Sequence, residues 1–466
     1  MRFARRKGGE NPMHQRGDIV TMLHLIFGGI HLDGRKEGTR RKPLSVPEVE
    51  PERVVIPLNM HVGEPCSPLV TVGDTVCVGQ PIGASQEGVL IHASISGQVE
   101  EIGLRPHPWG EPEQAVVIRN DNRQTRWPER GQGCDDYDSL SPEEIIHRIR
   151  QAGVVGMGGG GYPTADKLEQ ARGRVDVLIV NAAESEPYVT ADHRLLLERS
   201  EGVLVGLCLL MKAVGAADAV VAVEGNKLNA VEVLERTAKR LNLTGRVCAV
   251  PSRYPLGAEK QVIKSVAGRE VPPGKTAVDV GCVVFNAATA FAVYEAVVKE
   301  LPLTHRVVTV TGAAVARPRN LWVPIGMEMS ELVKAAGGFQ EKPTLMLMGG
   351  PMMGLEQPDL SAPVIKSTNS LVCLLDWEWD RQTDESVCIR CGRCVSVCPM
   401  HLMPLLVDKE LKLGGDVREL RRLNTQDCMG CGCCDYVCPA HIPLVARMRQ
   451  AWQIVTCAEK DGEVTP

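Results

Sequence analysis

Residues 153–188 read GVVGMGGGGYPTADKLEQARGRVDVLIVNAAESEPY, and this stretch decides the fold of the central part of the chain. Five glycines in six positions, Gly156 and Gly158 to Gly161, let the backbone approach a ligand and aim its amides at it, as in phosphate-binding loops. Lys167 follows at helical distance. Residues 175–180 form a buried strand, and the polar stretch 181–188 begins at its carboxyl end, where open α/β sheets bind ligands.

The same alternation continues downstream. Strands at 219–223 and 246–250 are followed by polar loops at 224–226 and 251–259, and the stretch 283–289 opens another helix. An amphipathic helix at 142–150 precedes the glycines. A glycine-rich run alone indicates a flexible turn, and this one lacks the strand-first Gly-x-Gly-x-x-Gly order. Four loops carrying Gly, Asn, Glu and Tyr at matching ends of neighbouring elements nevertheless favour a ligand site.

Two cysteine runs near the C-terminus, 388–399 and 428–439, repeat the spacing Cys-x2-Cys-x2-Cys-x3-Cys-Pro. Bacterial ferredoxins hold two [4Fe–4S] clusters with this spacing, and the fourth cysteine of each run ligates the other cluster. Zinc needs only two cysteine pairs. Cys433 has no counterpart in the first run, which indicates a spare thiol. We therefore expect one cluster on Cys388, Cys391, Cys394 and Cys438, and the other on Cys428, Cys431, Cys434 and Cys398.

The flanking segments predict smaller modules. Residues 54–120 alternate in short strands and tight turns and resemble the flattened barrel of biotinyl and lipoyl carriers. The stretch 83–88, where carriers present a lysine, has none, so a scaffold or docking module is expected. Residues 306–337 predict a hairpin and then a helix capped by Ser330, and the tight loop 349–354 is expected to pack on the central domain. An apolar stripe follows the second cysteine run, formed by Leu444, Val445, Met448, Trp452 and Val455.

Composition sets further bounds. A chain of 466 residues with net charge −5 is expected to form two to four domains, and no charge block suggests nucleic acid. Seventeen cysteines, eight of them in ferredoxin spacing, favour a reducing cytoplasm. No stretch is apolar enough to span a membrane. The sequence leaves open whether translation starts at Met1 or Met22. A basic patch is interpreted as a solvated segment; it consists of Arg35, Lys36, Arg40, Arg41 and Lys42.

In combination, the motifs resemble a known family. The segment Gly-Tyr-Pro-Thr-x-x-Lys, the loop Asn-x-x-Glu-x-Glu-Pro, Tyr-x-x-Gly-x-Glu and Asn-x-x-Thr are similar to the flavoprotein subunit of NADH:quinone oxidoreductases. Phe27-Gly-Gly-Ile-His31, the β-domain and the two cysteine runs resemble the RnfC family, which belongs to the Rnf complex, an ion-pumping NADH:ferredoxin oxidoreductase. Ala183 and Ala258 stand where the flavoprotein subunit has acidic residues.

The resemblance implies roles at matching positions. Non-covalent FMN would be held by Gly156, Gly158, Gly159, Lys167, Asn181, Asn286 and Thr289. The nicotinamide side would be lined by Glu184, Glu186, Tyr254 and Glu259. It also implies an α/β multidomain fold with five parts: a lead-in (1–50), a lipoyl-like β barrel-sandwich (51–125), a Rossmann-like FMN/NADH-binding domain (140–302), a β-grasp module for soluble ligands (303–366) and a ferredoxin-like helical domain with two [4Fe–4S] clusters (367–457).

The implied function is electron transfer between NADH, FMN and the two clusters, since FMN can take an electron pair and release single electrons. The expected partners are the other Rnf membrane subunits, a ferredoxin-type iron–sulfur subunit and ferredoxin, at the cytoplasmic face of the membrane. Two alternatives stay open: a soluble flavin and iron–sulfur reductase for another acceptor such as cobalamin, and an electron-relay adaptor with a decayed flavin site. The coupling ion and the direction of electron flow stay undetermined.

Overall fold

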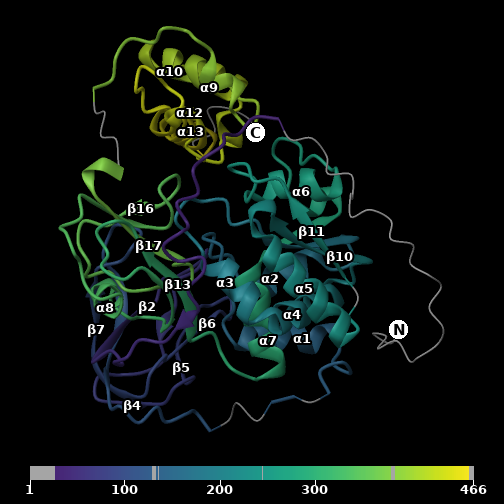
Figure 1. The fold of residues 1–466 in the computed structure, drawn as a ribbon, viewed down its shortest axis with the longest axis vertical. Coiled ribbons are helices and arrows are strands. Elements are labelled where there is room, and N and C mark those ends of the chain that lie inside the picture. The colour runs from purple at the N-terminus through teal and green to yellow at the C-terminus, as the bar shows by residue number, and fades with distance from the viewer. Residues whose placement is uncertain (1–26, 129–132, 135, 244, 379–383, 461–466) are drawn as a thin grey trace.

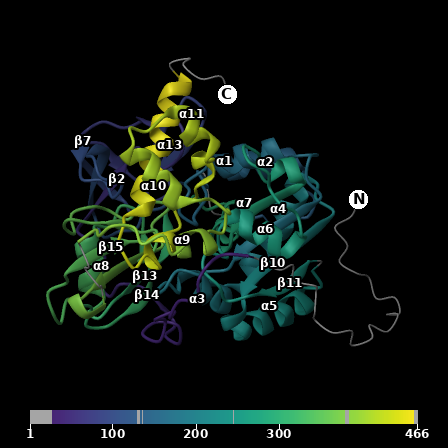
Figure 2. The ribbon, with the colours of Figure 1, turned by 90° about the horizontal axis from the view of Figure 1, so that it is seen from above.

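The structure, a computed structural model, describes residues 27–460 apart from 129–132, 135, 244 and 379–383. The segment 1–26, with both alternative start methionines, lies outside the described residues. Figure 1 shows a β-rich half beside a half built on a parallel sheet, with a small helical domain at one end of the long axis. Seen from above in Figure 2, the helices of that small domain lie across the boundary between the two halves.

The first module is all β, as predicted. Its strands form a four-stranded antiparallel sheet in the order β2-β8-β7-β4 and a three-stranded sheet in the order β3-β5-β6. Val54, Ile56 and Ile118 are fully buried between them. The strands are β2 (Arg53–Pro57), β3 (Ser67–Pro68), β4 (Thr75–Val76), β5 (Pro81–Ala84), β6 (Leu90–His92), β7 (Gly97–Arg105) and β8 (Glu113–Asn120).

The central domain is an open parallel sheet in the order β11-β10-β9-β12. Leu178 and Val180 of β9 belong to the main apolar core with helices α4 and α7, while Ile179 belongs to a second core with Val262 of α6. Burial on both faces explains the nearly continuous apolar strands. The elements are α1 (Pro142–Gln151), α2 (Thr164–Ala171), β9 (Val177–Ala182), α3 (Ala191–Glu198), α4 (Ser200–Val214), β10 (Asp218–Glu224), η1 (Gly225–Lys227), α5 (Leu228–Leu241), β11 (Arg246–Val250), α6 (Glu259–Ala267), η2 (Val278–Val280), β12 (Cys282–Asn286) and α7 (Ala287–Val298).

The strand order locates the place where a ligand fits. From β9 the chain moves outward to β10 and β11 and then returns to form β12 on the other side of β9. Loops after β9 and β12 therefore leave in opposite directions and open a crevice at the carboxyl edge of the sheet. Asn181 and Asn286 end these two strands and face each other in register.

The third module is a mixed sheet in the order β1-β14-β13-β17-β15-β16. It contains the predicted hairpin and helix, but the predicted cap is wrong: Glu328 occupies the N-cap of α8 without a side-chain capping bond, and Ser330 lies inside the helix. The strand β1 joins it from the N-terminal lead-in. The elements are β1 (Leu44–Ser45), β13 (His305–Thr311), β14 (Arg319–Pro324), α8 (Met329–Ala335), β15 (Leu345–Met348), β16 (Leu355–Glu356), β17 (Ser370–Leu374) and η3 (Asp376–Glu378).

The cysteine runs lie mostly in loops beside short helices, and two small apolar clusters form the core of this domain. The apolar stripe on the last helix is mostly core: Leu444, Met448 and Val455 are buried, whereas Trp452 is 47% exposed. In the described part of the chain, no helix is long and apolar enough to cross a membrane. The helices are α9 (Arg393–Ser396), α10 (Pro404–Lys412), α11 (Val417–Arg422), η4 (Thr425–Asp427), α12 (Cys433–Tyr436) and α13 (Leu444–Lys460).

Candidate functional site

A cavity of about 410 Å3, here named the central cavity, opens at the carboxyl edge of the parallel sheet. This volume lies within the range of small-molecule sites. The glycine-rich loop and three of the four loops predicted at strand ends meet there: 181–188, 251–259 and 283–289. The fourth, 224–226, does not line the cavity, and Gly160 rather than the expected Gly159 lies in the lining. The predicted residues that line it are Gly156, Gly158, Lys167, Asn181, Glu184, Glu186, Tyr254, Glu259, Asn286 and Thr289.

The two asparagines at the sheet edge are held by their own hydrogen bonds. Asn181 accepts from the Ala183 amide at 3.0 Å and donates to the Gly257 carbonyl at 2.7 Å. Asn286 caps α7 and donates to Asp192 at 2.6 Å. Both side chains are thereby fixed at the rim of the crevice, so a ligand meets a preorganised surface.

The glycine-rich loop is pinned at its ends and open in its middle. The Gly156 amide bonds to the Tyr162 carbonyl at 2.8 Å, and the Met157 amide donates to the Thr289 hydroxyl at 2.9 Å. A Cβ on Gly158 would lie 3.1 Å from the Cβ of Asn286. At Gly159 and Gly160, a Cβ would meet no described atom within 4 Å. The loop thus leaves a strip of bare backbone beside the cavity, which suits a flat ring or a phosphate.

Lys167 supplies the positive charge of the described cavity lining. Its Nζ lies 2.7 Å from Glu259 and 5.5 Å from the centre of the Phe285 ring. The Lys167 side chain is 26% exposed and that of Glu259 is 44% exposed, so the pair lies at the mouth of the cavity rather than in its floor. An incoming anion can therefore reach the ammonium group.

Deeper in the cavity, carboxylates gather. Burial raises the pKa of Glu186 to about 7; its Oε2 accepts from the Met352 amide at 3.1 Å, and its Oε1 has no hydrogen-bond partner among the described residues. Glu184 accepts from the Asp192 amide at 2.8 Å. Burial and the charge of Glu184 raise the pKa of Asp192 to about 7. Such oxygens suit a ligand that donates hydrogen bonds, as the ribityl hydroxyls and ring amide of FMN do.

Two lysines that the sequence did not single out for this site support it from below. The interpretation of Lys36 as solvated is wrong: it is 7% exposed, and its Nζ donates to the carbonyls of Glu184 at 2.6 Å and Val189 at 2.7 Å. Burial lowers its pKa to about 8. Lys227 donates to the same Glu184 carbonyl at 3.2 Å and pairs with Glu224. The loop 224–226 thus lies beneath the cavity, where Glu224 holds Lys227, and it does not line the cavity itself.

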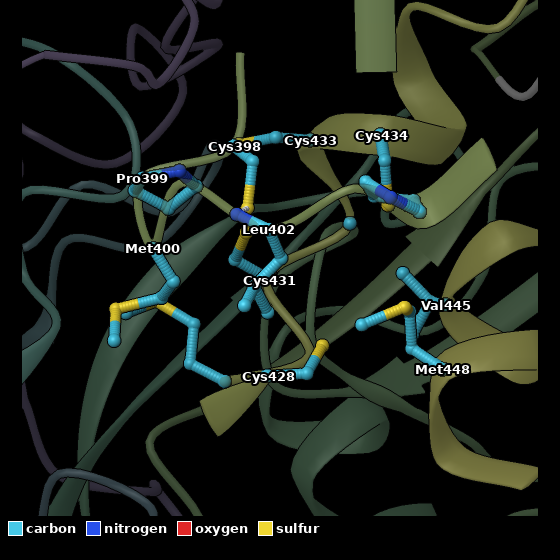
Figure 3. Close-up of a pocket in the computed structure, with 13 residues that line it drawn as sticks. Cys398, Pro399, Met400, Leu402, Cys428, Cys431, Cys433, Cys434, Val445 and Met448 are labelled. Carbon is cyan, nitrogen blue, oxygen red and sulfur yellow. Dashed lines mark hydrogen bonds between the residues drawn. The ribbon is translucent and has the colours of Figure 1, made fainter. Parts of the chain in front are cut away.

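The eight cysteines of the two runs separate into two groups, each around its own pocket. Cys398, Cys428, Cys431 and Cys434 line what we name the inner pocket, together with Cys433. Figure 3 shows them around it, with Val445 and Met448 of α13 on one side. The outer pocket is lined by Cys388, Cys391, Cys394 and Cys438.

These groupings are the ones that the ferredoxin spacing predicts, and each offers the four thiolates that a [4Fe–4S] cluster needs. In the described ranges, no three His, Cys, Asp or Glu residues are grouped so that they could hold a single metal ion.

The inner pocket adjoins the central cavity. Met429 lines both. Tyr254 lines the cavity and donates its hydroxyl to the carbonyl of Cys431 at 2.7 Å. The outer pocket lies next to strongly exposed apolar side chains, Val387 and Ile389. The order from the sheet to the surface is therefore central cavity, inner pocket, outer pocket.

A glycine-rich crevice on a parallel sheet, joined to two four-cysteine pockets, defines a flavin and iron–sulfur electron-transfer protein. The matching families agree with this class. They are the RnfC barrel sandwich hybrid domain (residues 24–123), the Nuo51 FMN-binding domain (149–295), the SLBB domain (307–356) and the 4Fe–4S dicluster domain (381–439).

Similar proteins narrow the class to one family. The chain is 40% identical over 389 residues to the C-subunit of the proton-translocating ferredoxin:NAD+ oxidoreductase complex of Clostridium ljungdahlii, covering 83% of this chain and 84% of that one. It is also 40% identical over 392 residues to the C-subunit of the Na+-translocating complex of Acetobacterium woodii, covering 83% and 87%. The chain belongs to this family, the RnfC family. A solved NAD+-reducing NiFe hydrogenase matches 70% of this chain and 63% of its own at 20% identity, with a TM-score of 0.49.

Proposed function

We propose that this chain, as the RnfC-type member of an ion-translocating ferredoxin:NAD+ oxidoreductase complex, passes electrons between NADH, FMN in the central cavity and two [4Fe–4S] clusters in the cysteine pockets. The continuity of the central cavity with the inner pocket, through Met429 and Tyr254, carries the proposal. FMN supplies the conversion between a hydride and single electrons. In the overall balance, NADH would give up two electrons and one proton as a hydride. The cysteine pockets would hold clusters that can each accept one electron, and the proton would pass to solvent.

The residue roles follow the geometry of the lining. Lys167 offsets the phosphate charge. The glycine-rich loop, with Gly156, Gly158 and Gly159, takes the cofactor against its backbone, which is open at Gly159 and Gly160. Asn181, Asn286 and Thr289 fix the crevice at the sheet edge. The nicotinamide side is assigned to Glu184, Glu186, Tyr254 and Glu259. The inner cluster is assigned to Cys398, Cys428, Cys431 and Cys434, and the outer cluster to Cys388, Cys391, Cys394 and Cys438.

The surroundings of the outer pocket support an exit for electrons. Cys391 is exposed, and Val387 and Ile389 beside it are 87% and 67% exposed. We assign this face to the contact with a ferredoxin-type iron–sulfur subunit or ferredoxin. The chain would lie peripherally at the cytoplasmic face of the membrane, beside the other subunits. We also propose that the chain divides into domains at 51–125, 140–302, 303–378 and 384–457. The boundary expected between 366 and 367 is moved, because β17 pairs with β13 and β15 of the third module and η3 follows it directly.

The test is anaerobic reduction of the isolated chain by NADH. The expected result is bleaching of the flavin absorbance, followed by reduction of at least one cluster, with no other subunit present. Wild-type protein that holds a full complement of FMN and clusters but ignores NADH would refute the proposal and favour the relay adaptor.

A further inference from the structure

The N-terminal strap, here defined as residues 28–45, links the central cavity to the inner pocket. In Figure 1 it runs from the cysteine-rich domain down between the two halves of the body. Along the way the Gly34 carbonyl accepts from the Tyr188 amide at 2.7 Å, and Lys36 reaches the floor of the central cavity. The strap ends as β1, which pairs in parallel with β14. Its first residues lie at the joint between the central cavity and the inner pocket.

On the cysteine side of this joint, the strap touches the backbone that carries a predicted ligand. The Gly29 amide donates to the Val397 carbonyl at 2.7 Å. A Cβ on Gly28 would lie 2.6 Å from the carbonyl oxygen of Cys398, and Gly28 has φ +75°. Since a side chain would clash and the left-handed backbone would be strained, this position requires glycine.

On the flavin side, the strap pairs with the loop that holds Tyr254. The Ile30 amide donates to the Tyr254 carbonyl at 2.8 Å, and the Tyr254 amide donates back to Ile30 at 3.0 Å. A Cβ on Gly29 would lie 2.4 Å from the Tyr254 carbonyl oxygen, and Gly29 has φ +73°. The two glycines therefore bring one backbone segment into contact with Tyr254 and with the neighbourhood of Cys398 at once.

Ile30 fills the space between the two sides. It is 7% exposed and belongs to an apolar cluster with Tyr254, Cys431 and Cys433, against which Met429 packs. Two side chains of α6 add a hydrogen bond and an ion pair across the joint. Gln261 donates to the Pro399 carbonyl at 2.9 Å, and Lys260 lies 3.5 Å from Asp427. The strap contributes the backbone hydrogen bonds and the apolar filling of this contact.

We propose that Gly28, Gly29 and Ile30 are positioning residues that set the gap between the central cavity and the inner pocket, and with it the rate of electron transfer from FMN to the inner cluster. This inference rests on the proposed function. In the step concerned, the reduced flavin loses one electron and the inner cluster gains it, and no covalent bond forms or breaks. Because electron tunnelling slows steeply with distance, a small separation at this joint is sufficient to slow the step.

The main variant is Gly29→Ala, because a methyl group there pushes against the Tyr254 carbonyl and leaves the Cys398 backbone untouched. The matched control is Gly34→Ala in the same strap, where a Cβ would meet only the Lys36 side chain, at 3.6 Å or more. Iron, sulfide and flavin contents are measured first. Hydrogen–deuterium exchange of peptides covering 28–32 and 252–256, which contain the Gly29, Ile30 and Tyr254 amides that bond across the joint, then reports whether the joint has loosened. Anaerobic stopped-flow absorbance separates flavin reduction from cluster reduction.

For Gly29→Ala we expect normal cofactor contents, normal bleaching of the flavin by NADH, faster amide exchange in both peptides and cluster reduction slowed by about tenfold or more. Gly34→Ala should behave as wild type. The inference is overturned if Gly29→Ala exchanges faster but reduces its clusters at the wild-type rate, or if it changes neither exchange nor rate.

A second variant covers a failure of Gly29→Ala to fold or to hold its clusters. Ile30→Ala keeps both glycines and the backbone bonds but removes the apolar filling, and it should slow cluster reduction while leaving flavin reduction intact. A wild-type rate there overturns the inference. If wild-type protein and Gly34→Ala both fail to reduce FMN with NADH, the proposed function fails instead. Bound flavin photoreduced with a tertiary amine as electron donor then serves as the electron source, because dithionite would reduce the clusters directly. The same comparison of cluster reduction rates still decides the role of the strap.

Discussion

Replacing Lys167 by Met should empty the flavin site without unfolding the chain. The ion pair of Lys167 with Glu259 is partly exposed on both sides, so its loss should cost no more than about 1 kcal/mol of folding free energy. The ionisable carboxyl groups of the described lining, which do not favour a phosphate, are Glu184, Glu186, Asp192 and Glu259. Loss of a charge-assisted hydrogen bond to FMN should cost about 1.5–3 kcal/mol, which weakens FMN binding roughly tenfold to 150-fold.

The matched variant is Glu259→Gln, which removes the other half of the same ion pair. Its amide oxygen still accepts from Lys167, so FMN affinity should stay within a factor of about two of wild type, while the apparent affinity for NADH falls by about tenfold or more. Titration of the flavin-depleted proteins with FMN, followed by quenching of its fluorescence, measures the first effect. NADH-dependent bleaching rates measure the second. Equal loss of FMN in both variants, or tight FMN binding by Lys167→Met, would refute the division of roles.

Three further outcomes are expected. Anaerobically purified protein should contain about eight irons and eight acid-labile sulfides. In electron paramagnetic resonance spectra, Cys398→Ser should perturb the inner cluster more than the outer one. Zinc without sulfide, or damage confined to the outer cluster, would contradict the assignment. Acid should release all the FMN, because the loop from Gly156 to Lys167 has no cysteine or histidine for a covalent link; flavin left on the denatured chain would be the opposite result. Burial raises the pKa of Glu186 from 4.5 to about 7, so the folded chain keeps a proton that the unfolded chain releases, and this group should lower stability by up to about 1.4 kcal/mol per pH unit as the pH rises from about 5 to 7. Thermal melts of Glu186→Gln should show a correspondingly shallower slope, because Asp192 and Glu295 keep their own contributions, whereas the exposed control Glu232→Gln should retain the wild-type slope.

Local patterns in the sequence were enough to predict the elements that carry the site. The strands expected at 175–180 and 219–223 occur as β9 and β10, shifted or extended by one or two residues, because apolar runs bounded by polar loops define buried parallel strands. The loops after them converge because the carboxyl ends of parallel strands share one edge of the sheet. The cysteine spacing likewise predicted the two groups. Three members of each group come from one run, and the fourth comes from the other run, as the ferredoxin pattern requires.

Features that depend on distant partners were not predictable in the same way. Lys36 lies in a basic stretch whose neighbours Arg35 and Arg41 are exposed, and its burial comes from carbonyl acceptors about 150 positions away. The cap of α8 was misassigned for a related reason. The sequence offered Ser330 as a capping residue, but its amide instead donates to the Leu360 carbonyl at 3.0 Å, a contact with a segment thirty positions further on.

Tyr254 illustrates how one residue can belong to two sites that the sequence presents as separate. Its motif, Tyr-x-x-Gly-x-Glu, indicated a place on the nicotinamide side, and it does line the central cavity. Its hydroxyl, however, is committed to the carbonyl of Cys431, and its backbone is committed to Ile30. A chain that moves electrons between two cofactors needs residues that hold the two cofactor sites at a fixed distance from each other. Such residues are identified only when the domains are seen together, because part of their contacts lies in each domain.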